Sequence, residues 1–348
     1  MLVIDPPSSV HRWRRGDGFS LHQQLRQVDE RLWSFRPFAL PGRDRPGLAL
    51  ASDPIIAGQI EWAARQVLPA RRALVTFSPA RGWLTGVRRD LVVYWRRDAA
   101  AQPHYVPSVR LAKSRHRRLL RQADLVTAVS PQLVEEARHT NPRAFLVPNG
   151  ADVEHFRDPV TRPDLMTRRS PVIGYLGAVS WRVDVGLLEA VARARPDWTI
   201  VLVGQPSVDI ARLPNLLSVG GQPYNELPGW AQAFDVGLVP YTNASFNRAS
   251  FPLKVFDYLA SGVPVVASPL PALAGLDPCV RLADGASGFT AAIEAMLHDG
   301  PSPEACRELA ERNSWDARAA LLEHLVEDRL HARTSGAPVQ TPFSTHDE

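Results

Sequence analysis

Short runs of β-branched and aliphatic residues alternate with helical patterns along most of this 348-residue chain. Alternation of this kind is typical of parallel sheets that are covered by helices on both faces. The strands expected in the first half are residues 1–4, 32–38, 74–77, 90–95, 125–129 and 145–147. Those expected in the second half are residues 172–176, 199–203, 216–219, 236–240, 264–267 and 280–282. The pattern predicts an α/β fold with two Rossmann-like, doubly wound domains.

The two series of strands are separated by a stretch without periodicity. Residues 158–170 hold prolines and a serine among arginines, which indicates a linker. The clearest helices are expected at residues 54–67, 131–139, 183–195, 225–234, 252–261, 286–298 and 315–329. We therefore predict an N-terminal domain at residues 1–157, a linker at 158–170, a C-terminal domain at 171–312, a closing helix at 313–332 and a disordered tail at 333–348. Ligands of such folds bind at the carboxyl ends of the strands, so a cleft between two facing sheets is the expected place for the chemistry.

The composition excludes several classes of protein. Two cysteines, Cys279 and Cys306, provide neither a disulfide framework nor the spacing of a zinc site. The chain has no run of roughly 20 apolar residues, and residues 1–4 are too short for a signal-peptide core. We expect a cytoplasmic protein that does not cross a membrane. Its formal net charge of +4 favours polyanionic or phosphorylated partners.

The positive charge is concentrated in one short stretch. Seven basic side chains fall within residues 110–121, namely Arg110, Lys113, Arg115, His116, Arg117, Arg118 and Arg121. The apolar residues between them have the spacing of an amphipathic helix. Three interpretations stay open: a solvated helix face, contact with an anionic surface at the inner face of a membrane or with a lipid-phosphate acceptor, and nucleic acid. We discount nucleic acid, because no helix-turn-helix, finger or RNA-binding motif accompanies the charge.

A helix expected after Pro252 and before Gly262 has clear boundaries. At about 100° per residue its apolar side chains share one half of the helix, while Lys254 and Asp257 lie on the other. The helix N-terminus and Lys254 suit a diphosphate, and Asp257 can accept hydrogen bonds from a ribose diol. The alternative is an exposed ion pair worth a few tenths of a kcal/mol.

The sequence from Phe251 to Val266 reads Phe-Pro-Leu-Lys-Val-Phe-Asp-Tyr-Leu-Ala-Ser-Gly-Val-Pro-Val-Val. It resembles the donor-site helix of GT-B glycosyltransferases of family 4 and of the related group 1 enzymes. Residues 123–130, 147–156, 173–184, 224–240 and the helix that opens at Trp315 are similar to other segments of that family. The resemblance covers about residues 91–325, densely after Asp124, and it implies a GT-B fold.

In that family the C-terminal domain holds a nucleoside diphosphate sugar. The resemblance implies that amides near Gly177 approach the diphosphate, that Arg182 and Lys254 neutralise it as it leaves, and that Asp257 holds the ribose. It places Ser250, Pro252, Leu253 and Tyr224 at the donor as well. Charge clamps of this kind replace a metal, and the chain has no Asp-x-Asp motif, so we expect no metal site and no cofactor besides the sugar donor.

Two features depart from the family pattern. Family 4 enzymes usually carry an acidic residue near the transferred sugar, eight positions before the ribose-side acid, and here that position is Ala249. The ribose-side acid itself is shortened from the usual Glu to Asp257. Family members also open with a strand, a glycine-bearing loop and a helix before a strand like residues 1–4, so the N-terminal domain is expected to lack its first β-α unit.

Residues on the acceptor side are less strongly indicated. Asp98 follows an expected strand, and the resemblance puts an acid there, so we name it as a catalytic candidate beside Arg182 and Lys254. A carboxylate in a surface loop is the other interpretation. His104 has no visible partner to orient it. Trp181 flanks Arg182 and stacks on a base or sugar, or else belongs to the core.

The resemblance thus implies a metal-independent glycosyltransferase that retains anomeric configuration. The acceptor is a glycan, a lipid-linked molecule or a small molecule. Ala249 and the missing β-α unit motivate an alternative, a catalytically degenerate GT-B subunit that binds nucleotide or glycan and supports a partner enzyme. A sugar-nucleotide epimerase is disfavoured, because the Pro-Leu-Lys segment points to the transferases.

Overall fold

The structure is a computed structural model, and it describes residues 1–5, 8–9, 24–39, 48–77, 86–98, 109–158, 160–161, 163 and 171–335. The chain forms two compact units. Unit 1 comprises Met1–Trp95, Pro103–Val126 and Val326–Glu348, and unit 2 comprises Arg96–Gln102 and Thr127–Leu325. The segment from Thr127 to Arg157, which the sequence assigns to the N-terminal domain, thus clusters with unit 2. The domain boundaries drawn from the sequence stay a prediction, and most of the expected linker lies outside the described residues.

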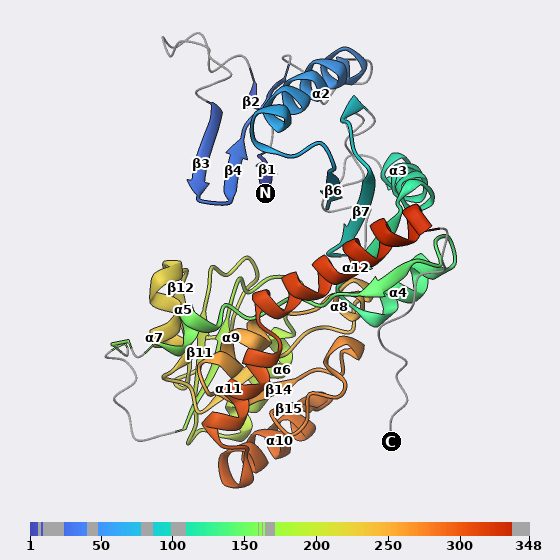
Figure 1. The fold of residues 1–348 in the computed structure, drawn as a ribbon. Helices are drawn as coiled ribbons and strands as arrows, with labels where there is room; N and C mark the ends of the chain where they lie inside the picture. The colour runs from blue at the N-terminus through green and yellow to red at the C-terminus, as the bar shows by residue number, and fades with distance from the viewer. Residues whose placement is uncertain are drawn as a thin grey trace, which may run out of the picture. The chain divides into compact units, whose positions relative to one another are not determined.

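A six-stranded parallel sheet forms the centre of unit 2 (Figure 1). Its strands are β10 (Val172–Leu176), β11 (Thr199–Val203), β12 (Leu216–Gly220), β13 (Val236–Val239), β14 (Val265–Ala267) and β15 (Val280–Leu282). Their spatial order is β12-β11-β10-β13-β14-β15, the order of a doubly wound Rossmann sheet. All six strands were expected. Four of them, β10, β11, β13 and β14, are buried along their whole length, and a strand buried on both faces lacks polar alternation. The α/β prediction is confirmed.

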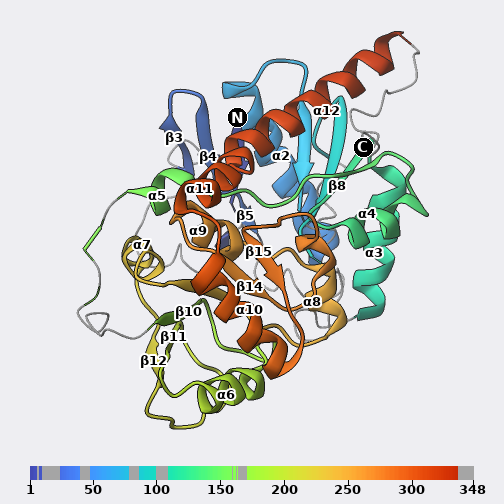
Figure 2. The ribbon, with the colours of Figure 1, turned by 90° about the horizontal axis from the view of Figure 1, so that it is seen from below.

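Two groups of helices in unit 2 pack beside its sheet (Figure 2). One pairs α6 (Val185–Ala194) with α10 (Gly285–Asp299). The other joins α5 (Val153–Arg157), α7 (Leu227–Ala231), α9 (Lys254–Ala260) and α11 (Pro303–Arg312). Because α6 and α9 follow strands that progress in opposite directions from the middle of the sheet, right-handed crossovers place these two groups on opposite faces. Helix α9 is thereby fixed between β13, β14 and its neighbouring helices.

Unit 1 is built on smaller sheets. Strands β1 (Leu2–Ile4), β4 (Leu32–Phe35) and β3 (Leu25–Asp29) form one sheet, and β2 (Ser8–Ser9) pairs with β5 (Phe38–Ala39). A third sheet has the order β6-β7-β8-β9, from β6 (Ala73–Thr76), β7 (Leu91–Arg96), β8 (Leu125–Ala128) and β9 (Ala144–Leu146), and the boundary between the units passes through it. Helix α2 (Leu48–Val67) buries Ile56, Ile60 and Ala63 in a core with Phe35. Helix α3 (Val109–Gln122) of unit 1 and helix α4 (Pro131–Arg138) of unit 2 were both expected.

Several local expectations were wrong. Strand β3 was not expected, because its sequence LRQVD shows no apolar run. It pairs antiparallel with β4. The expected strand 32–38 is divided into β4 and β5. Helix α2 begins at Leu48 and contains Pro54 in its interior, although a proline was expected to open it. Helix α11 was missed, because it is short and largely polar.

The final helix, α12 (Trp315–Ser335), continues beyond the expected end at residue 329. Its residues up to Leu325 belong to unit 2, and those from Val326 belong to unit 1. Arg333 forms an ion pair with Asp124 at 3.0 Å within unit 1. The rest of the expected disordered tail, residues 336–348, lies outside the described part of the chain. No helix in the described ranges has the length and apolar character to cross a membrane.

Two glycines meet where β10 and β11 end. The amide of Gly177 donates to the carbonyl oxygen of Val203 at 2.8 Å, and a Cβ placed on Gly204 would lie only 2.0 Å from the carbonyl oxygen of Gly177. Backbone occupies that space and cannot rotate away as a side chain can. Gly204 is therefore required for the loop after β10 to cross the end of β11.

We predict that Gly204→Ala lowers the free energy of unfolding by about 1–3 kcal/mol, because the added methyl group forces the backbone of Gly177 to move. Thermal unfolding checks this. Gly288→Ala in α10 is the matched control, since a Cβ there meets no atom closer than 3.9 Å. That variant should unfold at the wild-type temperature or slightly higher. Equal unfolding temperatures for both variants would contradict the prediction.

Candidate functional site

The order of the six-stranded sheet reverses between β10 and β13, and the candidate site lies at the carboxyl ends of these two strands. Three segments supply its residues. They are the loop from Gly177 to Asp184 after β10, Tyr241 after β13, and the stretch from α8 (Ser245–Ala249) into α9. The strands place these segments side by side because the carboxyl ends of parallel strands share one edge of the sheet.

Helix α9 has the boundaries expected from the sequence. It begins at Lys254 and is followed by Gly262, whose φ of 82° lies in the left-handed region. Val255, Phe256 and Leu259 are buried beneath it, whereas Lys254 and Asp257 are only partly exposed. The exposed ion pair that the sequence left open is thus replaced by two half-buried charges.

The ammonium group of Lys254 lies against an aromatic surface. Nζ is 3.7 Å from the centre of the Tyr175 ring and 5.4 Å from that of Tyr241, distances at which a cation is attracted to a ring face. A Cβ on Gly177, which has φ of 118°, would lie 2.8 Å from Nζ. Glycine at position 177 therefore leaves the room that the ammonium group occupies.

Arg182 is held rigidly by neutral partners. Its Nε donates to Oδ1 of Asn247 at 2.8 Å, and its Nη2 donates to Oγ of Ser250 at 2.9 Å. The guanidinium also lies 4.7 Å from the ring centre of Tyr241 and 4.9 Å from that of Phe246. Across the described residues, no ion pair joins a carboxylate to Arg182 or to Lys254.

Lys254 and Arg182 thus bring two positive side chains together, and within the described part of the chain no carboxylate forms an ion pair with either of them. Burial lowers the pKa of Lys254 well below its ordinary value, the positive charge of Arg182 lowers it further, and Asp257 opposes both. An anion that bound between Lys254 and Arg182 would offset this repulsion. The arrangement is therefore that of an anion-binding site.

Asp257 lies one helical turn after Lys254. Burial raises the pKa of its carboxyl to about 7; Lys254 lowers that pKa, and the negative charge of Asp152 raises it. Asp152 accepts a hydrogen bond of 2.9 Å from the hydroxyl of Tyr224. The ring of Tyr224 stacks on His155 with the ring centres 4.2 Å apart, and Tyr224 remains 56% exposed. An exposed aromatic face thus lies close to a polar acidic group.

Hydrogen bonds from an earlier part of the chain fix the segment before α9. Ser130, the N-cap of α4, donates from Oγ to the carbonyl oxygen of Ala249 at 2.7 Å, within the interior. Asn149 donates from Nδ2 to the carbonyl oxygen of Phe251 at 3.1 Å. These two bonds determine where Ser250 lies, and hence where Ser250 can hold Arg182.

The predicted site residues divide into two sets. Gly177, Arg182, Ser250 and Lys254 come together through the contacts above. Pro252 and Leu253 form the turn that enters α9, with Pro252 buried and Leu253 45% exposed. Tyr224 and Asp257 are linked through Asp152, which lies near both of them.

Asp98 is exposed in a bend after β7. No hydrogen bond or ion pair joins it to the residues around Lys254 in the described ranges, and its acceptor-side role stays a prediction. His104 lies outside the described residues. Trp181 is 38% exposed, with its ring 5.7 Å from that of Phe246, so it is neither free of the protein nor fully in the core.

Sequence reasoning missed five residues that build the site, namely Tyr175, Asp152, Tyr241, Asn247 and Asn149. Asn149 stands before Gly150 in a pair typical of a turn, and Tyr175 lies in the expected strand 172–176. Neither position indicates which group the side chain contacts. Among the residues that the structure describes, no group of three or more His, Cys, Asp or Glu side chains is arranged to hold a metal ion.

Comparison with known proteins bears on the same part of the chain. Residues 170–299 match the family model of glycosyl transferases group 1. TuaH of Bacillus subtilis, a protein named for glycosyl transfer in teichuronic acid biosynthesis, is 30% identical over 255 residues, which are 65% of this chain and 64% of TuaH. The chain thus spans 64% of the length of this curated relative.

Solved structures share the fold at low sequence identity. Sucrose-phosphate synthase from Thermosynechococcus elongatus superposes with a TM-score of 0.69 at 19% identity, over 95% of this chain and 89% of that one. Trehalose 6-phosphate synthase from Burkholderia multivorans superposes with a TM-score of 0.64 at 11% identity, over 98% of this chain and 99% of that one. HepE of Anabaena, solved in complex with UDP, superposes with a TM-score of 0.61 at 14% identity, over 84% of this chain and 86% of that one. The chain has the GT-B fold of these glycosyltransferases, and its residues 170–299 carry the sequence pattern of glycosyl transferases group 1.

Proposed function

We propose that this chain is a glycosyltransferase that moves a sugar from a nucleoside diphosphate sugar to a glycan, lipid-linked or small-molecule acceptor. The observation that carries the proposal is the pair formed by Lys254 and Arg182, two cations fixed at the switch point of the sheet. A diphosphate is negatively charged and would neutralise these two cations. HepE, which shares the fold, is solved with UDP and with UDP-glucose, and this favours a nucleotide-sugar donor here.

Transfer breaks the bond between the anomeric carbon and the diphosphate oxygen, forms a bond from that carbon to an acceptor hydroxyl oxygen, and passes the hydroxyl proton to the leaving diphosphate. Negative charge grows on the leaving diphosphate as the first bond breaks. Preorganised cations stabilise that charge more strongly in a partly buried site than in water. Arg182 is locked by Asn247 and Ser250, so it is already in place when the charge develops.

Other residues are assigned to the parts of the donor that surround the diphosphate bond. Asp257 accepts hydrogen bonds from the ribose, and the exposed ring of Tyr224 offers a surface for the nucleoside. The amide groups near Gly177 approach the phosphates, and the turn of Pro252 and Leu253 borders them. In this proposal no metal takes part, the configuration at the anomeric carbon is retained, and Asp98 acts on the acceptor side.

A second candidate function has one observation in its favour. Ala249, at the position where family 4 enzymes place a sugar-side acid, is buried, and its carbonyl oxygen is used by Ser130. A chain without that acid can bind nucleotide or glycan as a degenerate subunit that supports a partner enzyme. Donor binding is common to both functions, whereas turnover belongs to the first alone.

Donor binding is tested with UDP-, GDP- and dTDP-sugars by thermal shift and then by calorimetry. We expect one nucleotide series to stabilise the protein, and Lys254→Ala to weaken its binding at least tenfold, because a charged hydrogen bond is lost. The chain has only two lysines, Lys254 and Lys113, so Lys113→Ala is the matched control and should bind as the wild type does. Stabilisation that survives both Lys254→Ala and Asp257→Ala would disprove the donor-site assignment.

The pH dependence of donor binding tests Asp257 separately. With a pKa of about 7, its carboxyl is largely protonated at pH 6 and ionised at pH 8. Only the ionised form offers both oxygens as acceptors, so donor affinity should rise roughly tenfold over this range. In Asp257→Asn the rise should disappear. A variant that keeps the wild-type slope would show that another group titrates.

Metal independence is tested by turnover in a chelator. Slow hydrolysis of the preferred donor, followed as release of the nucleoside diphosphate, should proceed at the same rate with and without EDTA, because Arg182 and Lys254 supply the positive charge. A rate that falls in EDTA and returns with Mg²⁺ or Mn²⁺ would contradict metal independence. Donor binding without any turnover would instead favour the degenerate subunit.

A further inference from the structure

Helix α3 carries positive charge that the donor site does not use. Six of its side chains are exposed cations: Arg110, Lys113, Arg115, Arg117, Arg118 and Arg121. The helix sequence, VRLAKSRHRRLLRQ, contains no acidic residue. Within the described ranges no ion pair or hydrogen bond neutralises any of these six side chains.

The opposite side of α3 faces the protein. Leu120 is buried, and Nδ1 of His116 lies 3.0 Å from the hydroxyl of Tyr94 on β7. At about 100° per residue, the six cations occupy roughly 200° of the helix circumference, and Leu120 and the half-buried side chains of α3 lie in the remainder. The apolar face of α3 is thus already used for packing, and its cationic face is presented outward.

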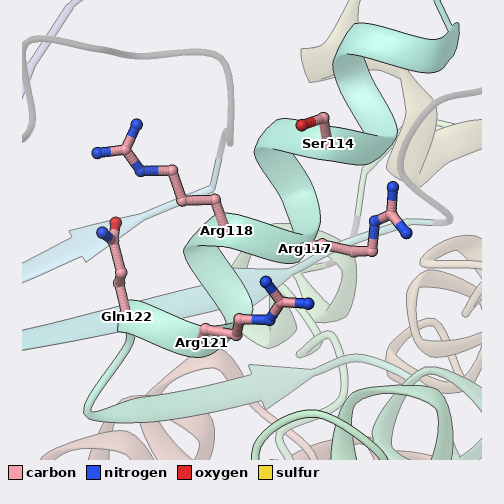
Figure 3. Close-up of a pocket in the computed structure, with 5 residues that line it drawn as sticks. All are labelled: Ser114, Arg117, Arg118, Arg121 and Gln122. Carbon is pink, nitrogen blue, oxygen red and sulfur yellow. The ribbon is translucent and has the colours of Figure 1, made fainter.

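The cationic face is hollowed. An open depression of about 630 Å³ is lined by Ser114, Arg117, Arg118, Arg121 and Gln122, at the helical spacing i, i+3, i+4, i+7 and i+8. All five side chains can donate hydrogen bonds. In Figure 3 the side chain of Arg118 points away from those of Arg117 and Arg121. The guanidinium groups do not converge on one point, so they suit several anionic groups spread over a surface better than a single phosphate.

We propose that the cationic face of α3 is a docking surface for a membrane that contains anionic lipids. The cations extend over about 17 Å of helix, at roughly 1.5 Å per residue from Arg110 to Arg121. That length matches several lipid headgroups, and guanidinium groups pair well with their phosphates. Because the apolar face of α3 is packed in the protein, adsorption is electrostatic and the helix does not insert. A nucleic-acid surface is disfavoured, because α3 carries no Phe, Tyr or Trp on which bases could stack and the ring of His116 packs against Tyr94.

The experiment is sedimentation of the full-length protein with vesicles of phosphatidylcholine alone or of phosphatidylcholine with phosphatidylglycerol. The test variant is Arg117→Gln, Arg118→Gln and Arg121→Gln combined. The control is Arg71→Gln, Arg212→Gln and Arg312→Gln combined, which removes the same charge from exposed arginines elsewhere. Circular dichroism confirms that both variants are folded.

We expect the wild type to bind anionic vesicles, to bind neutral vesicles weakly, and to be released by salt, since exposed charges are screened. At about 1 kcal/mol per basic residue near an anionic surface, the test variant should bind about a hundredfold more weakly, and the control should stay close to the wild type. The proposal is overturned if the test variant binds anionic vesicles as well as the wild type does, if the control loses as much as the test variant, or if neutral vesicles bind equally well. It is also overturned if a single-stranded oligonucleotide or soluble polyphosphate binds α3 and anionic vesicles do not.

Discussion

The candidate site depends on one contact, the ammonium group of Lys254 above the ring of Tyr175. Tyr175 is fixed because its strand is buried and its hydroxyl donates to the carbonyl oxygen of Ala178 at 3.1 Å. Gly177 must then lack a side chain, and Gly204 must lack one so that the backbone of Gly177 can pass. The chain has 40 lysine and arginine residues, of which only two are lysines. A compact ammonium fits between ring and backbone where a planar guanidinium would need more room.

Long-range hydrogen bonds complete what the sheet begins. Parallel strands bring Arg182 and Lys254 to one edge, but the geometry of the segment between α8 and α9 is set by Ser130 and Asn149, more than a hundred residues earlier. Both bonds end on backbone carbonyl groups, so they tolerate variation in the side chains of Ala249 and Phe251. The position of the segment therefore does not depend on which side chains stand at positions 249 and 251. A residue such as Ala249 can replace an acid without moving the cations.

The sequence predicted elements whose burial is dictated locally. Strands β10, β11, β13 and β14 of unit 2 were found because strands buried on both faces are continuously apolar, and α9 was found because Pro252 and Gly262 bound it. Strand β3 was missed because its stability comes from pairing with β4, which no local pattern reports. In the site, Lys254 and Arg182 were identified through the family resemblance, whereas Asn247 and Tyr241 were not. Their roles depend on loops that meet only after the sheet has formed.

The two positively charged regions differ in how solvent acts on them. Lys254 and Arg182 are partly enclosed by Tyr175, Tyr241 and Phe246, so the effective dielectric is lower there, and their attraction for an anion is strong and short in range. The arginines of α3 are exposed, and salt screens their field beyond roughly 8–10 Å. Enclosure favours a single, precisely positioned ligand and stabilises charge as a bond breaks. Exposure favours many weak contacts that form and break readily. The burial of each cluster, more than its charge, therefore separates the chemistry proposed for unit 2 from the adsorption proposed for α3.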